Sequence, residues 1–248
     1  MISDMGVTRN HITVVTGGGR GIGAAICTRL AREGHDVVIG YRSNRDRAQR
    51  VADAVEAAGA RALLVQADTA DEDDVDRLFA AAAEFGPITG LVNNAGVASP
   101  AAKLVDTPTS EFERVLAVNV LGVLLCSQRA IRAMAGRGGA IVNVSSGAAT
   151  LGSPGEYVHY AGSKAAVDAI TVGLAKELGP DGIRVNCVAP GTIWTEIHVD
   201  PDRPNKVAPR VPLGRAGQPE EIAGAVAWLL SDDASYTTGA VLRVAGGL

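Results

Sequence analysis

The 248-residue sequence is poor in cysteine, in aromatic residues and in excess charge of either sign. Its three cysteines, Cys27, Cys126 and Cys187, are odd in number and widely spaced among apolar residues. This pattern argues against a disulfide framework or a cysteine-based metal site, so we expect buried, reduced thiols in a cytoplasmic protein. The formal net charge of -4 provides no basic surface for nucleic acid or for an anionic membrane, and we expect neither as a partner.

Long hydrophobic runs and targeting signals are also missing. Residues 1–10 lack the basic start and apolar run of a secretory signal, and they are interpreted as a short polar tail. The longest apolar stretch, Val115 to Cys126, is too short to span a bilayer and contains Asn119. We therefore expect it to be part of a buried core helix.

Several catalytic and metal-binding patterns are absent. The four histidines, His11, His35, His159 and His198, show no metal-ligand spacing, and no metal site is expected. The acidic run from Asp71 to Asp74 is better explained as favourable charge at a helix N-terminus. A P-loop and a G-x-S-x-G nucleophile elbow are both missing, which disfavours a nucleoside triphosphatase and a hydrolase.

What is present is a regular alternation of short β-branched runs with amphipathic stretches. Strands are predicted at residues 11–17, 36–41, 61–68, 88–96, 139–146, 183–191 and 240–246. Helices are predicted at 21–33, 45–58, from 71 onward, 109–134, 160–178 and 220–230, with Ser110 and Glu113 spaced as a capping box. This rhythm predicts a single α/β domain over residues 11–248, with a Rossmann-like doubly wound parallel sheet of about seven strands and helices on both faces.

One segment breaks the alternation. Residues 192–219 contain five prolines, at positions 201, 204, 209, 212 and 219. Long connections of this kind inside a compact domain are often functional, so we expect a substrate lid here, a floppy insertion being the alternative.

The first predicted strand is followed by "TGGGRGIG", residues 16–23. Its glycines, Gly17, Gly19, Gly21 and Gly23, allow a sharp turn into a helix whose free N–H groups can bind a phosphate. A glycine cluster alone is weak evidence, but its place on the first βα turn favours a dinucleotide site.

The end of the second predicted strand bears on the choice of cofactor. It reads Tyr41, Arg42, Ser43 without the carboxylate that would receive the ribose 2′-hydroxyl of NAD. Arg42, together with Arg20 in the glycine turn, favours NADP(H) over NAD(H), although Arg42 could also be a solvated surface charge.

Tyr160 and Lys164 are four residues apart and would share one face of a helix. A tyrosine hydroxyl has a pKa near 10, and a neighbouring ammonium would lower that pKa. Gly162 and Ser163 between them are poor helix formers, and we expect their small size to let a cofactor or an adjoining subunit approach.

With "TGGGRGIG", "NNAG", "VSS", "YAGSK" and "VAPGTIWT" in this order, the chain resembles the short-chain dehydrogenase/reductase family over nearly its whole length. It looks most like the subfamily of β-ketoacyl carrier-protein reductases and glucose 1-dehydrogenases. The resemblance implies a catalytic set of Asn119, Ser146, Tyr160 and Lys164, with Asn119 holding a water that relays protons to the lysine. Ser145 is expected only to end its strand.

The resemblance also implies how a nicotinamide cofactor would be held. The cofactor-binding positions are Gly17, Gly19, Arg20, Gly21, Ile22, Gly23, Tyr41, Arg42, Ser43, Asp68, Thr69, Asn94, Ala95, Gly96, Tyr160, Lys164, Pro190, Gly191, Ile193 and Thr195. Asp68 could instead cap the following helix. The loop from Ser146 to Tyr160 looks about one residue longer than in the carrier-protein reductases, which leaves the substrate contacts open.

These features predict an NADP(H)-dependent oxidoreductase that interconverts a small-molecule carbonyl and a secondary alcohol, with Tyr160 as acid and base. An NAD-linked alcohol or sugar dehydrogenase is the first alternative, and a catalytically silent nucleotide-binding scaffold is the second. The resemblance also implies a homotetramer built through residues 109–134, 160–178 and 240–248. The substrate itself stays open among acyl thioesters, sugars, steroids and small ketones.

Overall fold

A computed structural model describes residues 11–248, so the polar tail predicted at residues 1–10 lies outside the described residues. Seven parallel strands form one sheet in the order β3-β2-β1-β4-β5-β6-β7. The strands are β1 (Ile12–Val15), β2 (Asp36–Tyr41), β3 (Ala62–Gln66), β4 (Ile88–Asn93), β5 (Gly139–Val144), β6 (Ile183–Pro190) and β7 (Val241–Val244). The predicted doubly wound parallel sheet is therefore confirmed.

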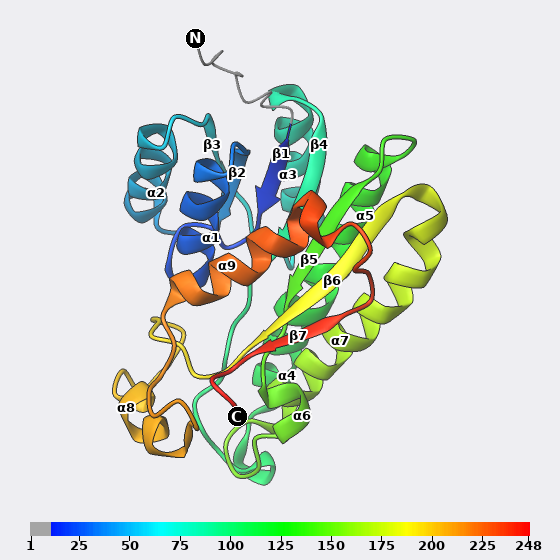
Figure 1. The fold of residues 1–248 in the computed structure, drawn as a ribbon. Helices are drawn as coiled ribbons and strands as arrows, with labels where there is room; N and C mark the ends of the chain where they lie inside the picture. The colour runs from blue at the N-terminus through cyan, green and yellow to red at the C-terminus, as the bar shows by residue number, and fades with distance from the viewer. Residues whose placement is uncertain (1–10) are drawn as a thin grey trace.

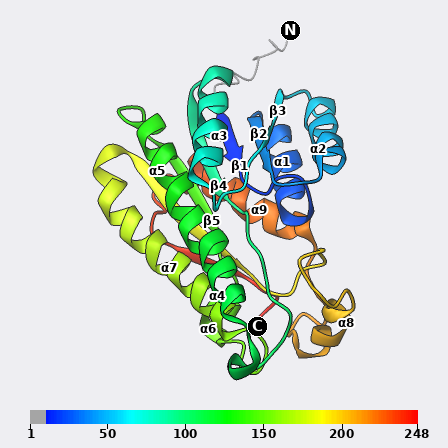
Figure 2. The same ribbon diagram turned by 180° about the vertical axis from the view of Figure 1, so that it is seen from behind.

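Helices cover both faces of the sheet (Figures 1 and 2). The longer helices are α1 (Gly21–Arg32), α2 (Arg45–Ala57), α3 (Glu72–Phe85), α4 (Thr109–Leu116), α5 (Gly122–Met134), α7 (Val158–Leu178) and α9 (Pro219–Leu230). Two short helices, α6 (Ala148–Leu151) and α8 (Arg203–Val207), were not predicted. Both lie at the end of the molecule where the strands terminate (Figure 1).

The core is divided between the two faces of the sheet. On one face α1, α2 and α9 bury residues such as Ile26, Val55 and Ile222 against the strands. On the other face α3, α5 and α7 bury residues such as Leu78 and Met134. Because both faces are covered, the strands are apolar along most of their length, as parallel sheets require.

The three cysteines are buried and free, as predicted. Desolvation raises the pKa of the Cys126 and Cys187 thiols to about 12. These thiols therefore stay protonated and behave as small apolar core residues.

The predicted helix over residues 109–134 is continuous but not uniform. Its middle five residues, Ala117–Leu121, form a π-helical turn that joins α4 to α5. By length and composition this helix could cross a membrane, but half of its most apolar window is buried inside the protein. It packs on β4 and α3, which is the behaviour of the core helix that the sequence predicts.

The capping box predicted at Ser110 and Glu113 is wrong. The residue before the helix is Pro108, in an extended conformation, and α4 begins directly after it. A proline fixes its own backbone in a conformation suited to helix entry. Ser110 consequently falls within the first turn, where it cannot act as an N-cap.

The helix predicted to begin at Tyr160 starts two residues earlier, at Val158. Gly162 and Ser163 therefore lie inside α7. Apart from its chain neighbours and the nearby backbone of α7, a Cβ atom on Gly162 would meet no described atom within 4 Å. The Ser163 side chain, however, is fully buried and hydrogen-bonded, so its small size serves packing rather than access.

Candidate active site

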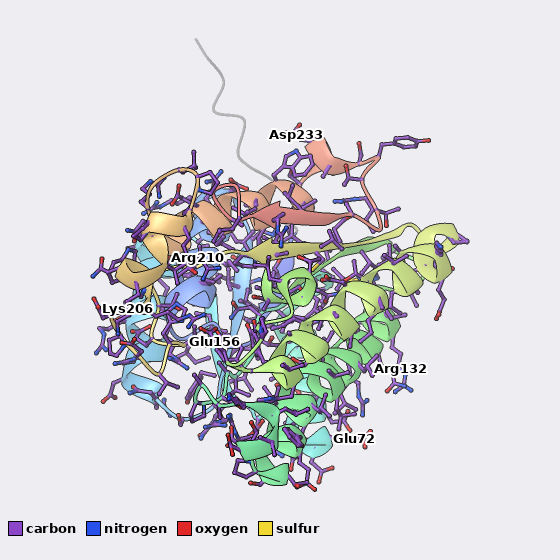
Figure 3. The ribbon with its side chains drawn as sticks, turned by 90° about the horizontal axis from the view of Figure 1, so that it is seen from below. Glu72, Arg132, Glu156, Lys206, Arg210 and Asp233 are labelled. Carbon is purple, nitrogen blue, oxygen red and sulfur yellow. The ribbon has the colours of Figure 1, made fainter. Side chains whose placement is uncertain are left out.

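A cleft opens along the carboxyl ends of the strands, where the sheet order reverses between β1 and β4. Open parallel sheets bind their ligands at this position. The cleft is lined by segments that follow each strand from β1 to β6. Figure 3 views the molecule from this end.

The glycine turn after β1 forms one wall of the cleft. Gly17 and Gly21 adopt φ values of 63° and 53°, a left-handed conformation that glycine accepts without penalty. A Cβ atom on Gly23 would collide with the carbonyl oxygen of Gly17 and come within 2.6 Å of Asn94 Nδ2. The turn therefore exposes the N-terminus of α1 to the cleft, as a phosphate cradle requires.

The "NNAG" segment after β4 holds this turn in place. Asn94 Nδ2 donates to the carbonyl oxygens of Thr16 at 2.9 Å and Gly17 at 3.1 Å. Thr16 Oγ1 accepts hydrogen bonds from the backbone N–H groups of Asn94 and Ala95. The Asn94 side chain is thus occupied by the scaffold, while Asn94, Ala95 and Gly96 line the cleft.

The predicted residues after β2 lie together at one end of the cleft. Tyr41 is buried, Arg42 and Ser43 are exposed, and all three line the cleft with Arg20. The guanidinium group of Arg20 donates to the carbonyl oxygen of Glu196 at 3.1 Å.

Arg47 is a further cation at this end that the sequence argument missed. It lies in the first turn of α2, lines the cleft and contacts the Glu196 carboxylate at 3.4 Å. The sequence contains a signal for this position. Arg47 follows the N-cap Asn44 by three residues and so lies in the first turn of α2, which begins at the carboxyl edge of the sheet, beside the cleft.

Asp68 and Thr69 line the cleft after β3. Asp68 does not cap the following helix, since Asp71 is the N-cap of α3 and accepts from the Asp74 N–H. Instead Asp68 accepts a hydrogen bond from the Ala70 N–H at 3.1 Å within its own loop. The capping alternative is therefore wrong for Asp68, whereas the favourable acidic charge predicted at this helix N-terminus is confirmed.

Tyr160 and Lys164 are both buried on the cleft-lining face of α7. Lys164 Nζ donates to the carbonyl oxygen of Val144 at 2.8 Å and lies 5.9 Å from the centre of the Tyr160 ring. Burial lowers the pKa of Lys164 to about 8. Burial also raises the pKa of Tyr160, and a hydrogen bond with Ser146 acts in the opposite direction. In the protein without ligands the pKa of Tyr160 is therefore raised, whereas the spacing of Tyr160 and Lys164 alone suggests that it is lowered.

The two serines at the end of β5 have different surroundings. Ser146 lines the cleft and accepts a hydrogen bond from the Ala148 N–H at 3.1 Å. Ser145 follows the last residue of β5 as expected, but its buried hydroxyl also donates to the carbonyl oxygen of Lys164 at 3.0 Å. Ser145 therefore anchors the helix that carries the tyrosine and lysine.

Asn119 lies in the π-helical turn and is fully buried. Its Oδ1 accepts from the Val97 N–H at 2.9 Å, and its Nδ2 donates to the Val97 carbonyl oxygen and to Ser163 Oγ. Both amide hydrogens are therefore donated to protein atoms. Asn119 thus clamps the loop after β4 to α7. A Cβ atom on Gly96 would lie 3.4 Å from both Asn119 Oδ1 and Lys164 Nζ, so the clamp lies close to the lysine.

The end of β6 and the segment after it close the other side of the cleft, with Pro190, Gly191, Ile193 and Thr195 on its lining. The Thr195 Oγ1 atom is buried and has no hydrogen-bond partner among residues 11–248. Its side chain lies against Gly21, since a Cβ atom there would be 3.5 Å from Thr195 Cβ. An unpaired hydroxyl beside the N-terminus of α1 is a donor prepared for an anionic group.

A family model described as enoyl-(acyl carrier protein) reductase matches residues 17–248. The chain belongs to the short-chain dehydrogenase/reductase family. This member is 47% identical to the uncharacterized oxidoreductase YgfF of Escherichia coli over 95% of its chain and 99% of that relative. It is 42% identical to L-rhamnose 1-dehydrogenase (NAD(P)(+)) of Azotobacter vinelandii, over 95% of both chains.

A solved short-chain dehydrogenase of Burkholderia cenocepacia in complex with NADP has a similar fold. The two chains superpose with a TM-score of 0.89 at 39% identity, over 96% of this chain and 97% of that one. The dehydrogenase/reductase described here is accordingly an oxidoreductase of a family that uses NAD(P) and acts on small molecules.

The cleft of this dehydrogenase/reductase fits a dinucleotide. The left-handed glycines, the exposed helix N-terminus and the unpaired Thr195 hydroxyl converge on one stretch of the cleft. Among residues 11–248, no group of three or more His, Cys, Asp or Glu side chains is placed to hold a metal ion.

Proposed function

We propose that the protein is an NADP(H)-dependent oxidoreductase that interconverts a carbonyl and a secondary alcohol. The observation that carries the proposal is the convergence of Ser146, Tyr160 and Lys164 with the glycine turn in one cleft. When bound, the cofactor would supply or accept the hydride. The name of the Azotobacter relative, which acts on a sugar with NAD(P)(+), supports the same class of reaction.

Each residue of the chain has a defined task in this proposal. The Tyr160 hydroxyl donates a proton to the carbonyl oxygen during reduction and becomes a phenolate, and in oxidation the Tyr160 phenolate accepts the proton of the alcohol. The Ser146 hydroxyl orients the same oxygen. Lys164, held by the Val144 carbonyl oxygen, places a positive charge near the Tyr160 ring and stabilises the phenolate.

Asn119 acts in this proposal mainly as a positioning residue, because both of its amide hydrogens are donated to Val97 and Ser163. The predicted water relay to Lys164 would then use the backbone of the π-helical turn. A π turn leaves backbone groups outside the regular helical hydrogen-bond ladder, which is consistent with such a water site.

Three arginines support a preference for NADP(H). Arg20, Arg42 and Arg47 line this end of the cleft, residues 42–44 contain no carboxylate, and the Glu196 carboxylate pairs with Arg47. Guanidinium groups are suited to binding a 2′-phosphate. The proline-rich segment 192–219 is proposed as the substrate lid because it begins beside the cleft and contributes Glu196, Ile197 and His198 to the lining.

A kinetic comparison tests the proposed function. The purified protein is assayed for oxidation of NADPH and of NADH with a panel of ketones and sugar lactones. Turnover with a higher kcat/KM for NADPH is the expected result, and Arg42→Asp should lower the NADPH value at least about tenfold while sparing NADH. Turnover with NADH alone would indicate the NAD-linked alternative, and no turnover with any compound would favour a silent nucleotide-binding protein.

A further inference from the structure

Glu156 lies at a junction of three loops around the reacting end of the cleft. It belongs to the loop between α6 and α7, and its carbonyl oxygen accepts a hydrogen bond from the Ala102 N–H at 2.8 Å in the loop after β4. Its carboxylate accepts two hydrogen bonds from Arg203 of α8, from Nη1 at 3.0 Å and from Nη2 at 2.7 Å. Figure 3 shows Glu156 on this side of the molecule, with Lys206 of α8 and with Arg210.

Arg203 stands close to the proposed chemistry. Its guanidinium carbon lies 5.3 Å from the centre of the Tyr157 ring, and the Tyr157 ring packs edge-on against the Tyr160 ring at 5.4 Å. Arg203 lines the cleft, together with Leu151, Ser153, Tyr157, Ile197 and His198. Only one aromatic ring separates this cation from the proposed proton donor.

A free arginine at such a place would attract substrates that carry a carboxylate. Here the two-point pairing with Glu156 occupies the end of the guanidinium group and cancels its charge. The side chains are only partly exposed, 26% for Arg203 and 39% for Glu156, so solvent screens this ion pair less than a fully exposed one. Arg203 holds the pKa of Glu156 below its usual range, with smaller contributions from Tyr157 and Arg210, so the carboxylate stays ionised at neutral pH.

The other titratable groups on this part of the lining, Tyr157 and His198, are neutral, and burial raises the pKa of Tyr157 to about 12. His198 Nε2 is hydrogen-bonded to the Ile193 carbonyl oxygen at 2.8 Å. Burial lowers the pKa of His198, which keeps the imidazole uncharged near pH 7. Leu151, Tyr157 and Ile197 add apolar surface. Beyond the buried Lys164, the reacting end of the cleft therefore presents almost no net charge to a substrate.

We propose that Glu156 is a specificity-determining residue that neutralises Arg203 and makes the pocket select uncharged carbonyl and alcohol substrates over those bearing a carboxylate. The inference rests on the proposed function for its reaction but concerns which substrates fit. Glu156→Gln keeps the shape of the side chain and its backbone link to Ala102 while leaving the Arg203 charge uncompensated. Such a variant should accept carboxylates that the natural enzyme rejects.

A matched pair of probes tests this selection without turnover. Benzamide and benzoate are titrated calorimetrically into the full-length protein in the presence of NADP⁺. The natural protein should bind benzamide more tightly, and Glu156→Gln should move the ratio of the two affinities toward benzoate at least about tenfold. The double variant Glu156→Gln, Arg203→Met should return the preference to benzamide. Glu177→Gln, which removes an exposed carboxylate of α7 outside the cleft, should leave the ratio unchanged.

Reduction of 4-acetylbenzamide and 4-acetylbenzoate, measured with the same variants, separates this inference from the proposed function. A shifted binding ratio without reduction of either ketone would support the selection and exclude these two ketones as substrates, while the proposed function is decided by the full carbonyl panel. Reduction with an unchanged ratio in Glu156→Gln would overturn the role of Glu156. Tighter binding of benzoate to the natural protein, or no binding of either probe to any variant, would also overturn it.

Discussion

At the scale of single residues, burial governs the chemistry of the proposed catalytic set. Tyr160 and Lys164 are both buried, and desolvation disfavours the charged form of each. The sequence spacing correctly places the pair on one face but gives no information on solvent access. In the proposed mechanism, the positive charges of Lys164 and of the bound cofactor would offset the rise in the Tyr160 pKa that burial causes.

The titration of Lys164 should be visible in the stability of the ligand-free protein. Its pKa is about 8 when folded and about 10.5 as a model value, so between these pH values the unfolded chain binds more protons. Stability contributed by this group therefore rises as the pH rises from about 8 to 10.5. Urea unfolding should show the natural protein gaining stability relative to Lys164→Met over this range.

Lys176→Met provides the control, because Lys176 is exposed on the same helix. A pH dependence of the stability difference no larger in Lys164→Met than in Lys176→Met would contradict a lowered pKa of Lys164.

At the scale of elements, the sequence predicts nearly every strand and long helix, because β-branched runs and helical periodicity are local signals. The π-helical turn at Ala117–Leu121 escapes such reasoning, since its sequence is that of an ordinary apolar helix. So does the buried chain of amides in which Asn93 donates to Asn143 and Asn143 to Thr171. These features depend on side chains that meet only after the sheet has formed.

The same limit applies to the candidate site. The glycine turn and the Tyr160–Lys164 pair were predictable because each lies within a few residues of sequence. Arg47, Glu156 and Arg203 were missed as site residues, because their partners are far away in the chain. Arg203 meets Glu156 across 47 positions.

The clamp formed by Asn119 gives a prediction at this scale. Asn119→Ala would leave the backbone N–H and carbonyl oxygen of Val97 without their partners. We expect the free energy of unfolding to fall by about 1 to 3 kcal/mol, as for other buried groups left unpaired. Urea denaturation measures the loss, with Gln128→Ala on the exposed side of α5 as the control. Equal stability of the two variants would show that the clamp contributes little.

At the scale of the whole molecule, two surfaces of this chain carry exposed apolar side chains. Leu116, Leu121 and Leu124 lie along the continuous helix of residues 109–134, and Trp228, Tyr236 and Val241 lie in or near β7, the edge strand. Large exposed apolar side chains gathered on one element are typical of protein contact surfaces. Both surfaces lie on or beside segments through which the proposed homotetramer would assemble.

Charge placed on the first surface should disrupt that assembly. Leu121 and Leu124 are 46% and 44% exposed in the single chain. Replacement of both by glutamate would bury two charges in the proposed contact, which is strongly unfavourable. Sedimentation should show a tetramer for the natural protein and a smaller species for the double variant. Val199→Glu, exposed elsewhere, should still form a tetramer; a natural protein that sediments as a monomer contradicts the prediction.

Replacing Tyr160 by phenylalanine tests the central claim most directly, because it removes one oxygen atom and keeps the ring against Tyr157. The measurement compares kcat for carbonyl reduction with the dissociation constant of NADPH in the same variant. Loss of the proton donor should lower kcat by at least about a thousandfold, while NADPH affinity changes by less than about threefold. A variant that retains the natural kcat would contradict the assignment of Tyr160 as the acid and base of the reaction.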